Sequence, residues 1–187
     1  MKNLWISFKF LVILSIVTGV IYPAIITGAS HLFFVDNTTG NIIVKDGKNI
    51  GAVFVGQLFQ QDKYFWGRPS AGNYNTLPSG ASNISPASSA IFQTMQENKA
   101  KYMNPTGKVA DEMLFTSASG IDPHISPQAA FEQVQRIANA RNISEKEVEK
   151  LINKTIEPRD FGFLGEMRVN VLKLNIALDD METYARK

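Results

Sequence analysis

An uncharged run of twenty residues near the N-terminus constrains this chain most. Residues 10–29 read FLVILSIVTGVIYPAIITGA and contain no Asp, Glu, Lys or Arg. A helix rises about 1.5 Å per residue, so the run is long enough to cross the roughly 30 Å hydrocarbon core of a bilayer. Unpaired backbone groups are costly in lipid, which favours a helix, kinked at Pro23. We therefore predict a transmembrane helix over residues 10–30.

Two interpretations of this helix compete, an uncleaved anchor and a cleaved signal peptide. A signal peptide has an apolar stretch of about 7–15 residues that ends at small residues. The run here is longer, although Thr27-Gly28-Ala29 would make a poor cleavage site. The anchor is the favoured interpretation, and the alternative is an exported enzyme or binding domain with a cleaved signal.

The flanking charges predict the orientation. Lys2 and Lys9 precede the run, whereas residues 31–44 contain no Lys or Arg. The positive-inside rule then places residues 1–9 in the cytoplasm and residues 31–187 outside it.

One face of the predicted helix is suited to packing against protein. Ser15, Gly19 and Pro23 recur every four residues, and small side chains let a second helix approach closely. Small residues are also common in membrane helices generally. We predict that this face packs against another membrane helix.

Composition excludes several functional classes for residues 31–187, the part predicted to lie outside the cytoplasm. Apart from Lys2 and Lys9, the chain carries 17 basic and 17 acidic residues, and it has no Cys. A neutral body has no basic surface for nucleic acid, and the absence of Cys excludes disulfides, zinc–cysteine sites and cysteine nucleophiles. Short strand patterns followed by helical ones favour one α+β domain.

Local patterns predict the elements of this domain. Two helix starts are marked, by Ser126-Pro127 and by the capping box of Ser144 with Glu147. The other expected elements are a turn at Asp46-Gly47, a strand at 50–59, a loop at 66–90, a helix that Ser85 caps and that ends near Tyr102, a turn at 104–107, a strand at 112–117, a loop at 117–127 and a last helix at 170–185.

The sequence shows no catalytic motif among those sought: no phosphate-binding loop, nucleophile elbow or zinc-protease motif is present. Asp122-Pro123-His124, with Ser117 and Ser119 nearby, invites a hydrolase interpretation. Asp and Pro are strong turn residues, so a turn is the favoured interpretation. We expect neither a metal nor a directly bound cofactor.

Arg68 is the cation of most interest, because it lies in an aromatic and glycine-rich stretch. It would bind a carboxylate or stack on a ring, or it would be a structural partner of an Asp. Arg68, Asn83 and Asp122 lie in the two Gly/Pro/Ser-rich loops, and binding residues are often on such loops. We predict that these three residues contribute to docking of a partner protein.

The chain resembles the C subunit of the bacterial Kdp potassium-transporting ATPase over essentially its whole length. The resemblance depends on several segments taken together in order. They are GVIYP at 19–23, GQLF at 56–59, YFWGRPS at 64–70, SGASN at 79–83, SASGIDPHISP at 117–127, Gln133 with Arg136 through Arg141, VNVL at 169–172 and LNIAL at 174–178. Met167 departs from the family, which often has Pro there.

The resemblance implies a pump of several subunits in the bacterial inner (plasma) membrane. A channel-like A subunit would select potassium and a P-type B subunit would hydrolyse ATP, so ATP and potassium would be handled by the partners. The C subunit would be a non-catalytic, single-span accessory chain, described as a catalytic chaperone that raises the ATP affinity of the B subunit.

The resemblance also implies a glutamine that contacts nucleotide, and Gln57 is the matching position. The predicted topology places Gln57 outside, whereas ATP is in the cytoplasm. We therefore expect a role in assembly or potassium entry, with any effect on ATP affinity transmitted through the complex. A sensor or adhesion domain held by one helix is the remaining rival.

Overall fold

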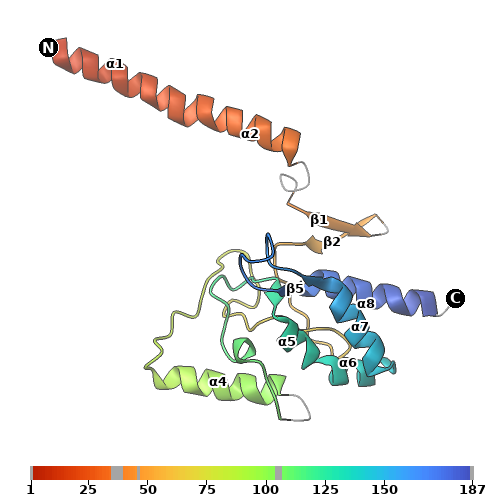
Figure 1. Ribbon diagram of the computed structural model, residues 1–187. Coiled ribbons are helices and arrows are strands. Elements are labelled where there is room, and N and C mark those ends of the chain that lie inside the picture. The colour runs from red at the N-terminus through yellow and green to blue at the C-terminus, as the bar shows by residue number, and fades with distance from the viewer. Residues whose placement is uncertain (1, 35–39, 46, 104–106, 186–187) are drawn as a thin grey trace. The chain divides into compact units, whose positions relative to one another are not determined.

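The computed structural model describes residues 2–34, 40–45, 47–103 and 107–185 (Figure 1). It divides into two compact units, Met1–Ile42 and Ile43–Lys187, which are described one at a time. Most of the turn predicted at 104–107 and half of that at Asp46-Gly47 lie outside the described residues.

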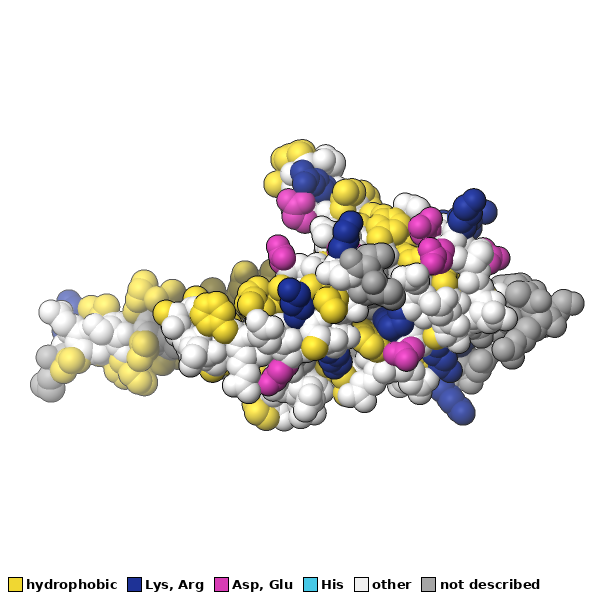
Figure 2. Space-filling model, turned by 90° about the horizontal axis from the view of Figure 1, so that it is seen from below, with side chains coloured by type: hydrophobic (Ala, Val, Ile, Leu, Met, Phe, Trp, Pro, Cys, Tyr) yellow, Lys and Arg dark blue, Asp and Glu magenta, His cyan; other side chains and the backbone are white. Residues whose placement is uncertain are grey.

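A long apolar helix dominates the first unit. It comprises α1 (Lys2–Ile16), a π-helical turn η1 (Val17–Ile21) and α2 (Tyr22–Phe33). Its most apolar window has a mean hydropathy of 2.3 and no buried residue, so it is apolar and long enough to span a membrane. Figure 2 shows its hydrophobic side chains lying on the surface.

The π turn accommodates Pro23, the second residue of α2. The backbone N–H of Tyr22 donates to the carbonyl of Val17, five residues back instead of four. In a regular helix the ring of Pro23 would clash with the carbonyl four residues earlier. One extra residue in the preceding turn shifts that register. The irregularity predicted at Pro23 is therefore a π turn directly before it.

The second unit contains helices on a small sheet, which confirms a mixed α and β domain (Figure 1). Antiparallel strands pair in the order β3-β5-β4, with Ile125 and Ile156 both opposite Val169. A separate two-stranded sheet pairs β1 with β2. The elements are β1 (Ile42–Lys45), β2 (Lys48–Ala52), α4 (Ser89–Tyr102), the 3-10 turn η2 (Asp111–Met113), β3 (His124–Ile125), α5 (Pro127–Phe131), α6 (Val134–Arg141), α7 (Glu145–Thr155), β4 (Ile156–Glu157), β5 (Arg168–Asn170) and α8 (Val171–Ala185).

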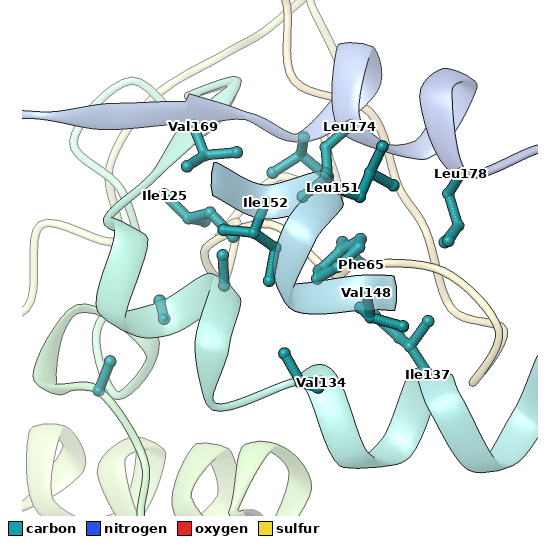
Figure 3. Packing of buried hydrophobic residues seen from close by; sticks show 14 of the residues in the cluster. Phe65, Ile125, Val134, Ile137, Val148, Leu151, Ile152, Val169, Leu174 and Leu178 are labelled. Carbon is teal, nitrogen blue, oxygen red and sulfur yellow. The ribbon is translucent and has the colours of Figure 1, made fainter. Parts of the chain in front are cut away.

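The core lies between the sheet and helices α5 to α8, and one loop residue enters it. Phe65 is fully buried although it belongs to no helix or strand. Figure 3 shows its ring among the side chains of α7 and α8. Val148 and Ile152 of α7 and Leu174 of α8 are also fully buried. A loop residue at the centre of the core needs a backbone that is held firmly in place.

Both predicted helix starts after residue 120 are confirmed. The Ser126 hydroxyl accepts the N–H of Ala129 at the start of α5, and Pro127 follows it. Ser144 and Glu147 form the reciprocal capping box of α7. These signals are local, because each depends on side chains within one helical turn.

The helix after Ser126 is interrupted, which the sequence did not predict. In a continuous helix the N–H of Gln133 would donate to the carbonyl of Ala129. Here that N–H donates to Ala130, and the Gln133 side-chain amide donates to Ala129 instead, at 3.1 Å. The break separates α5 from α6.

The strand predicted at 50–59 is wrong beyond Ala52, where β2 ends. The backbone then bonds to a side chain of β5 and to the loop that precedes β3. The carbonyl of Val53 accepts the side chain of Asn170 at 2.7 Å, and the N–H of Gly56 donates to the carbonyl of Ile121 at 2.7 Å. These partners replace a neighbouring strand.

Two more predictions need correction. The segment 112–117 is a 3-10 turn followed by irregular chain, not a strand, and the N–H of Ser117 donates to the carbonyl of Pro69. The helix predicted from Ser85 begins at Ser89, because the Ser88 hydroxyl caps it. Its end at Tyr102 and the last helix, from Val171 to Ala185, are confirmed.

Candidate functional site

Side-chain amides hold the backbone of residues 65 and 66 as a neighbouring strand would. The Asn175 side chain accepts the N–H of Phe65 at 2.8 Å and donates to the Phe65 carbonyl at 3.0 Å. Gln133 does the same for Trp66, at 2.8 and 3.1 Å. Both amides are almost fully buried. Each therefore pairs two backbone groups that would otherwise be buried without partners.

Two arginines of α6 bind the backbone of residues 62–64, directly before Phe65, in the same way. Arg136 donates to the carbonyls of Asp62 and Tyr64, and Arg141 donates to the carbonyl of Lys63 at 2.6 Å. Every carbonyl from 62 to 66 thus accepts a hydrogen bond from a side chain of the helical layer. We call residues 62–66 with Gln133, Arg136, Arg141 and Asn175 the backbone clamp.

The clamp also places an aromatic side chain. The guanidinium of Arg136 lies 3.7 Å from the ring centre of Trp66, and Tyr102 of α4 contacts the same ring edge-on at 5.7 Å. Burial lowers the pKa of Arg136 to about 10, so it stays protonated at neutral pH. The stacked cation and the hydrogen bonds fix Trp66 in one orientation.

A cavity of about 590 Å³ opens beside Trp66. Its polar wall includes Gln133 and Arg136, whose side chains are engaged by the clamp. Ligand sites need polar groups that point into them and are available. The rest of the wall is mixed: apolar side chains alternate with the polar residues Asp62, Lys101, Glu132 and Asn139.

Two of the predicted docking residues bind each other at the surface. Arg68 Nη1 lies 3.2 Å from Asp122 Oδ2, and their side chains are 26% and 30% exposed. The Nε of Arg68 is buried and has no hydrogen-bond partner among the described residues. An ion pair this exposed contributes about 0–1 kcal/mol. Arg68 thus contacts an Asp, as one of the two interpretations expected, and its part in docking stays a prediction.

Glycines let the 117–127 loop pass close to two other segments, the 66–90 loop at Gly80 and the chain after β2 at Gly56. A Cβ on Gly56 would lie 2.5 Å from the carbonyl oxygen of Asp122, and one on Gly120 would lie 2.7 Å from that of Gly80. The Ser70 hydroxyl donates to the Gly120 carbonyl at 2.6 Å. The crossing is therefore tight and made mainly by backbone.

Asn83 joins the same region from the 66–90 loop. It lines a groove of about 350 Å³ together with Arg68, Ile91 and Phe115. Its φ is +52°, a conformation that Asn tolerates better than most residues. The structure thus brings Arg68 to both Asp122 and Asn83, which we call the crossed-loop surface.

Asp122 forms a local side-chain turn that leads into β3 at His124. Asp122 Oδ1 accepts the backbone N–H of His124 at 3.0 Å, as Asp does in turns. The His124 ring lies 4.0 Å from Glu157 and 3.5 Å from Asn170, and Ser117 instead bonds through its backbone to Pro69. Burial lowers the pKa of His124, although Glu157 and Asp122 oppose the shift. These contacts favour a structural role for Asp122 and His124 over the hydrolase interpretation.

Known proteins match nearly the whole chain. The family model described as "KdpC: K+-transporting ATPase, c chain" matches residues 4–180. The chain belongs to the KdpC family. Relatives named "Potassium-transporting ATPase KdpC subunit" include one from Bradyrhizobium diazoefficiens, 44% identical over 90% of this chain and 92% of the relative. Another, from Rhodopseudomonas palustris (strain BisB5), is 42% identical over 96% of this chain and 97% of the relative. One from Caldanaerobacter subterraneus subsp. tengcongensis is 38% identical over 92% of each chain.

Several segments that carried the KdpC resemblance form the backbone clamp. Residues 64–66 of the 64–70 stretch are clamped, and Gln133, Arg136 and Asn175 clamp them. The sequence alone assigned these residues no role, because the partners are up to 110 positions apart. The one available sign of the clamp in the sequence was Asn175, a polar residue beside the apolar positions of the last helix.

Gln57, the position implied for nucleotide contact in KdpC proteins, folds back onto strand β2. Its Nε2 lies 3.4 Å from the carbonyl of Ile50 and occupies the space that a Cβ on Gly51 would need. It does not line the cavity beside Trp66 or the groove beside Arg68. Nucleotide contact at Gln57 stays a prediction.

The small-residue face of this KdpC helix is exposed. Ser15 lies in α1, Gly19 in the π turn and Pro23 in α2, and a Cβ on Gly19 would meet nothing within 4 Å. A partner helix has open space at Gly19. Packing of this face stays a prediction.

Replacing Gly19 by leucine should weaken association with partner subunits while leaving the fold of the second unit unchanged. The larger side chain would push a close helix away and lose packing contacts. Retention of partners on a tagged chain, in detergent, measures the effect. Gly28→Leu, also in open space but off this face, is the matched control. Equal retention by both variants would show that the face of Gly19 points toward lipid.

Proposed function

We propose that this chain is a non-catalytic accessory subunit of an ATP-driven potassium uptake pump. The observation that carries the proposal is the family match over residues 4–180, which includes both the apolar helix and the crossed-loop surface. Its partners would be a channel-like potassium subunit and an ATP-hydrolysing subunit. The chain would stabilise the assembly of these two subunits and raise the ATP affinity of the ATP-hydrolysing one.

The second unit is proposed to lie outside the cytoplasm. Lys2 and Lys9 lie at the N-terminal end of the apolar helix, and the positive-inside rule favours the cytoplasm for that end. The chain would then act at the side from which potassium enters. An effect on ATP affinity would have to pass through the subunits between the two sites.

A fusion tests this topology directly. A reporter that is active only outside the cytoplasm, joined after Lys187, should be active, and the mature chain should still begin near Met1. N-terminal sequencing and the reporter assay measure the two parts. A mature N-terminus near Ser30 would support a cleaved signal instead.

The crossed-loop surface is the proposed docking site for the outer face of the potassium subunit. The backbone clamp and the glycine crossing make it rigid, so binding would order few groups. Arg68 and Asp122 are both partly exposed, so a partner's charges could reach them.

Arg68→Ala should lower potassium-stimulated ATP hydrolysis of the complex with little change in the melting temperature of the purified chain. The exposed pair with Asp122 contributes about 0–1 kcal/mol to stability, whereas an interfacial ion pair that becomes buried contributes about 2–5 kcal/mol to binding. Lys150→Ala, on the exposed side of α7, is the control. If the variant chain melts much earlier and activity falls only in proportion, Arg68 is structural.

Reconstitution tests the accessory role itself. The other subunits, purified with and without this chain, should differ in potassium-stimulated ATP hydrolysis at low ATP concentration. The chain should lower the ATP concentration that gives half the maximal rate. Identical rate curves with and without the chain would contradict the proposal.

A further inference from the structure

A hairpin between α7 and α8 exposes an apolar tip. Its arms are β4 and β5, and Figure 1 shows it as the blue loop that leads into β5. Phe161 is 88% exposed, Phe163 71% and Leu164 49%. None of the three belongs to the core cluster or to the residues packed against it. We call residues 157–168 the apolar hairpin.

Backbone hydrogen bonds hold the tip of the hairpin in a defined turn. The N–H of Asp160 donates to the Leu164 carbonyl, and the N–H of Leu164 donates to the Asp160 carbonyl, both at 2.9 Å. The N–H of Phe163 also donates to the Asp160 carbonyl, at 3.3 Å. Tight turns of this kind hold the outward side chains in fixed positions before any partner binds.

Phe161 occupies a backbone conformation that disfavours it. Its φ is +54° and that of Gly162 is +82°, so both central residues of the turn are left-handed. Asn, Asp or Gly ordinarily stands at the first of these positions, and a bulky residue there is an outlier. The ring gains nothing inside the fold, because it is almost fully exposed. A strained and exposed aromatic residue points to a role outside the chain.

The charges around the tip are paired, with the carboxylates outermost. Arg159 pairs with Glu166 at 2.6 Å, with side-chain exposures of 44% and 83%. Arg168 lies 3.7 Å from Asp160, with exposures of 37% and 65%. Arg168 also contacts Glu157 at 3.1 Å, and this carboxylate is less exposed, at 28%, than the arginine. The two most exposed charged side chains of these pairs are nevertheless carboxylates, those of Glu166 and Asp160. The rim of the hairpin therefore presents negative charge to its surroundings.

This rim favours a protein partner over a membrane surface. Protein surfaces that bind lipid use unpaired cations to attract anionic headgroups. Arg159 and Arg168 are instead paired with Glu166 and Asp160, whose carboxylates are more exposed than the arginines. An apolar centre within a polar rim is the usual arrangement of a protein interface. Phe side chains held in place by a turn would bind with little loss of freedom.

We propose that the apolar hairpin inserts Phe161 and Phe163 into an apolar socket with a basic rim on another subunit of the potassium-transporting ATPase. This contact rests on the proposed function, and it is separate from the crossed-loop surface. It would be a second point of attachment for the second unit.

The double variant Phe161→Asn/Phe163→Ala tests the contact without harming the fold. Asn suits the left-handed turn, so the melting temperature of the full chain should hold or rise. Retention of the other subunits on the tagged full chain should fall about tenfold or more, because two buried aromatic contacts are lost. Phe92→Ala, an exposed phenylalanine on α4, should retain them normally.

A single label identifies what covers the tip. The chain has no Cys, so Phe163→Cys can carry one environment-sensitive fluorophore. In vesicles of phosphatidylglycerol and phosphatidylethanolamine that contain the full chain alone, the label should stay accessible to an aqueous quencher. It should become shielded in the purified complex. Shielding by the vesicles alone would overturn the proposal in favour of lipid, and accessibility in both would overturn it altogether.

The two proposals fail differently. If the unchanged chain retains no other subunit, the proposed function fails. If the unchanged chain and the double variant retain them equally, only the hairpin contact fails.

Discussion

Replacing Asn175 by leucine should lower the free energy of unfolding by about 2–6 kcal/mol. The Asn175 amide pairs both backbone groups of Phe65 inside the core. Leucine has a similar volume and no polar atoms, so it would leave an N–H and a carbonyl buried without partners. Each such group costs about 1–3 kcal/mol, a large part of a typical stability of about 5–15 kcal/mol.

Chemical denaturation of the full chain in detergent measures this loss. Asn153→Ala is the matched control, since the Asn153 amide is exposed and donates to the Glu149 carbonyl within the same helix, α7. It should change stability by about 0.5 kcal/mol or less. If Asn175→Leu is equally mild, the backbone clamp does not hold Phe65 in the core.

Gly120→Ala should destabilise the chain by about 2 kcal/mol or more and reduce the activity of the complex. Gly120 has a φ of +73°, which costs an alanine about 1–2 kcal/mol. Its new Cβ would also lie 2.7 Å from the carbonyl oxygen of Gly80, a backbone atom that cannot move alone. The crossed loops would have to separate.

Gly165→Ala isolates the effect of the crossing. Gly165 has a φ of +76°, and a Cβ there would meet nothing within 4 Å. The two variants share the conformational cost, so the difference between their unfolding free energies reports the contact with Gly80. Equal losses would mean that the loops adjust freely, and that the crossed-loop surface is not rigid.

Features that depend on neighbouring residues were predictable from the sequence. The long apolar run, the caps at Ser126 and Ser144 and the final helix each follow from side chains within a few turns. The three-stranded sheet was not predictable, because β3 and β4 have two residues each and form only through pairing with β5.

The candidate site was predictable only in part. Composition indicated that Arg68, Asn83 and Asp122 lie on loops, and the pairing of Arg68 with an Asp was one of two roles considered. The backbone clamp depends on contacts such as that of Gln133 with Trp66, 67 positions apart. The hairpin strain at Phe161 is a backbone property that residue patterns do not reveal.

Purification of the tagged full chain from detergent-solubilised membranes tests the central claim most directly. An accessory subunit held by one helix and a rigid second unit should bring a multi-span potassium subunit and an ATP-hydrolysing subunit with it, in fixed proportion through size exclusion. A chain that elutes alone, although it is intact and membrane-extracted, would contradict the account.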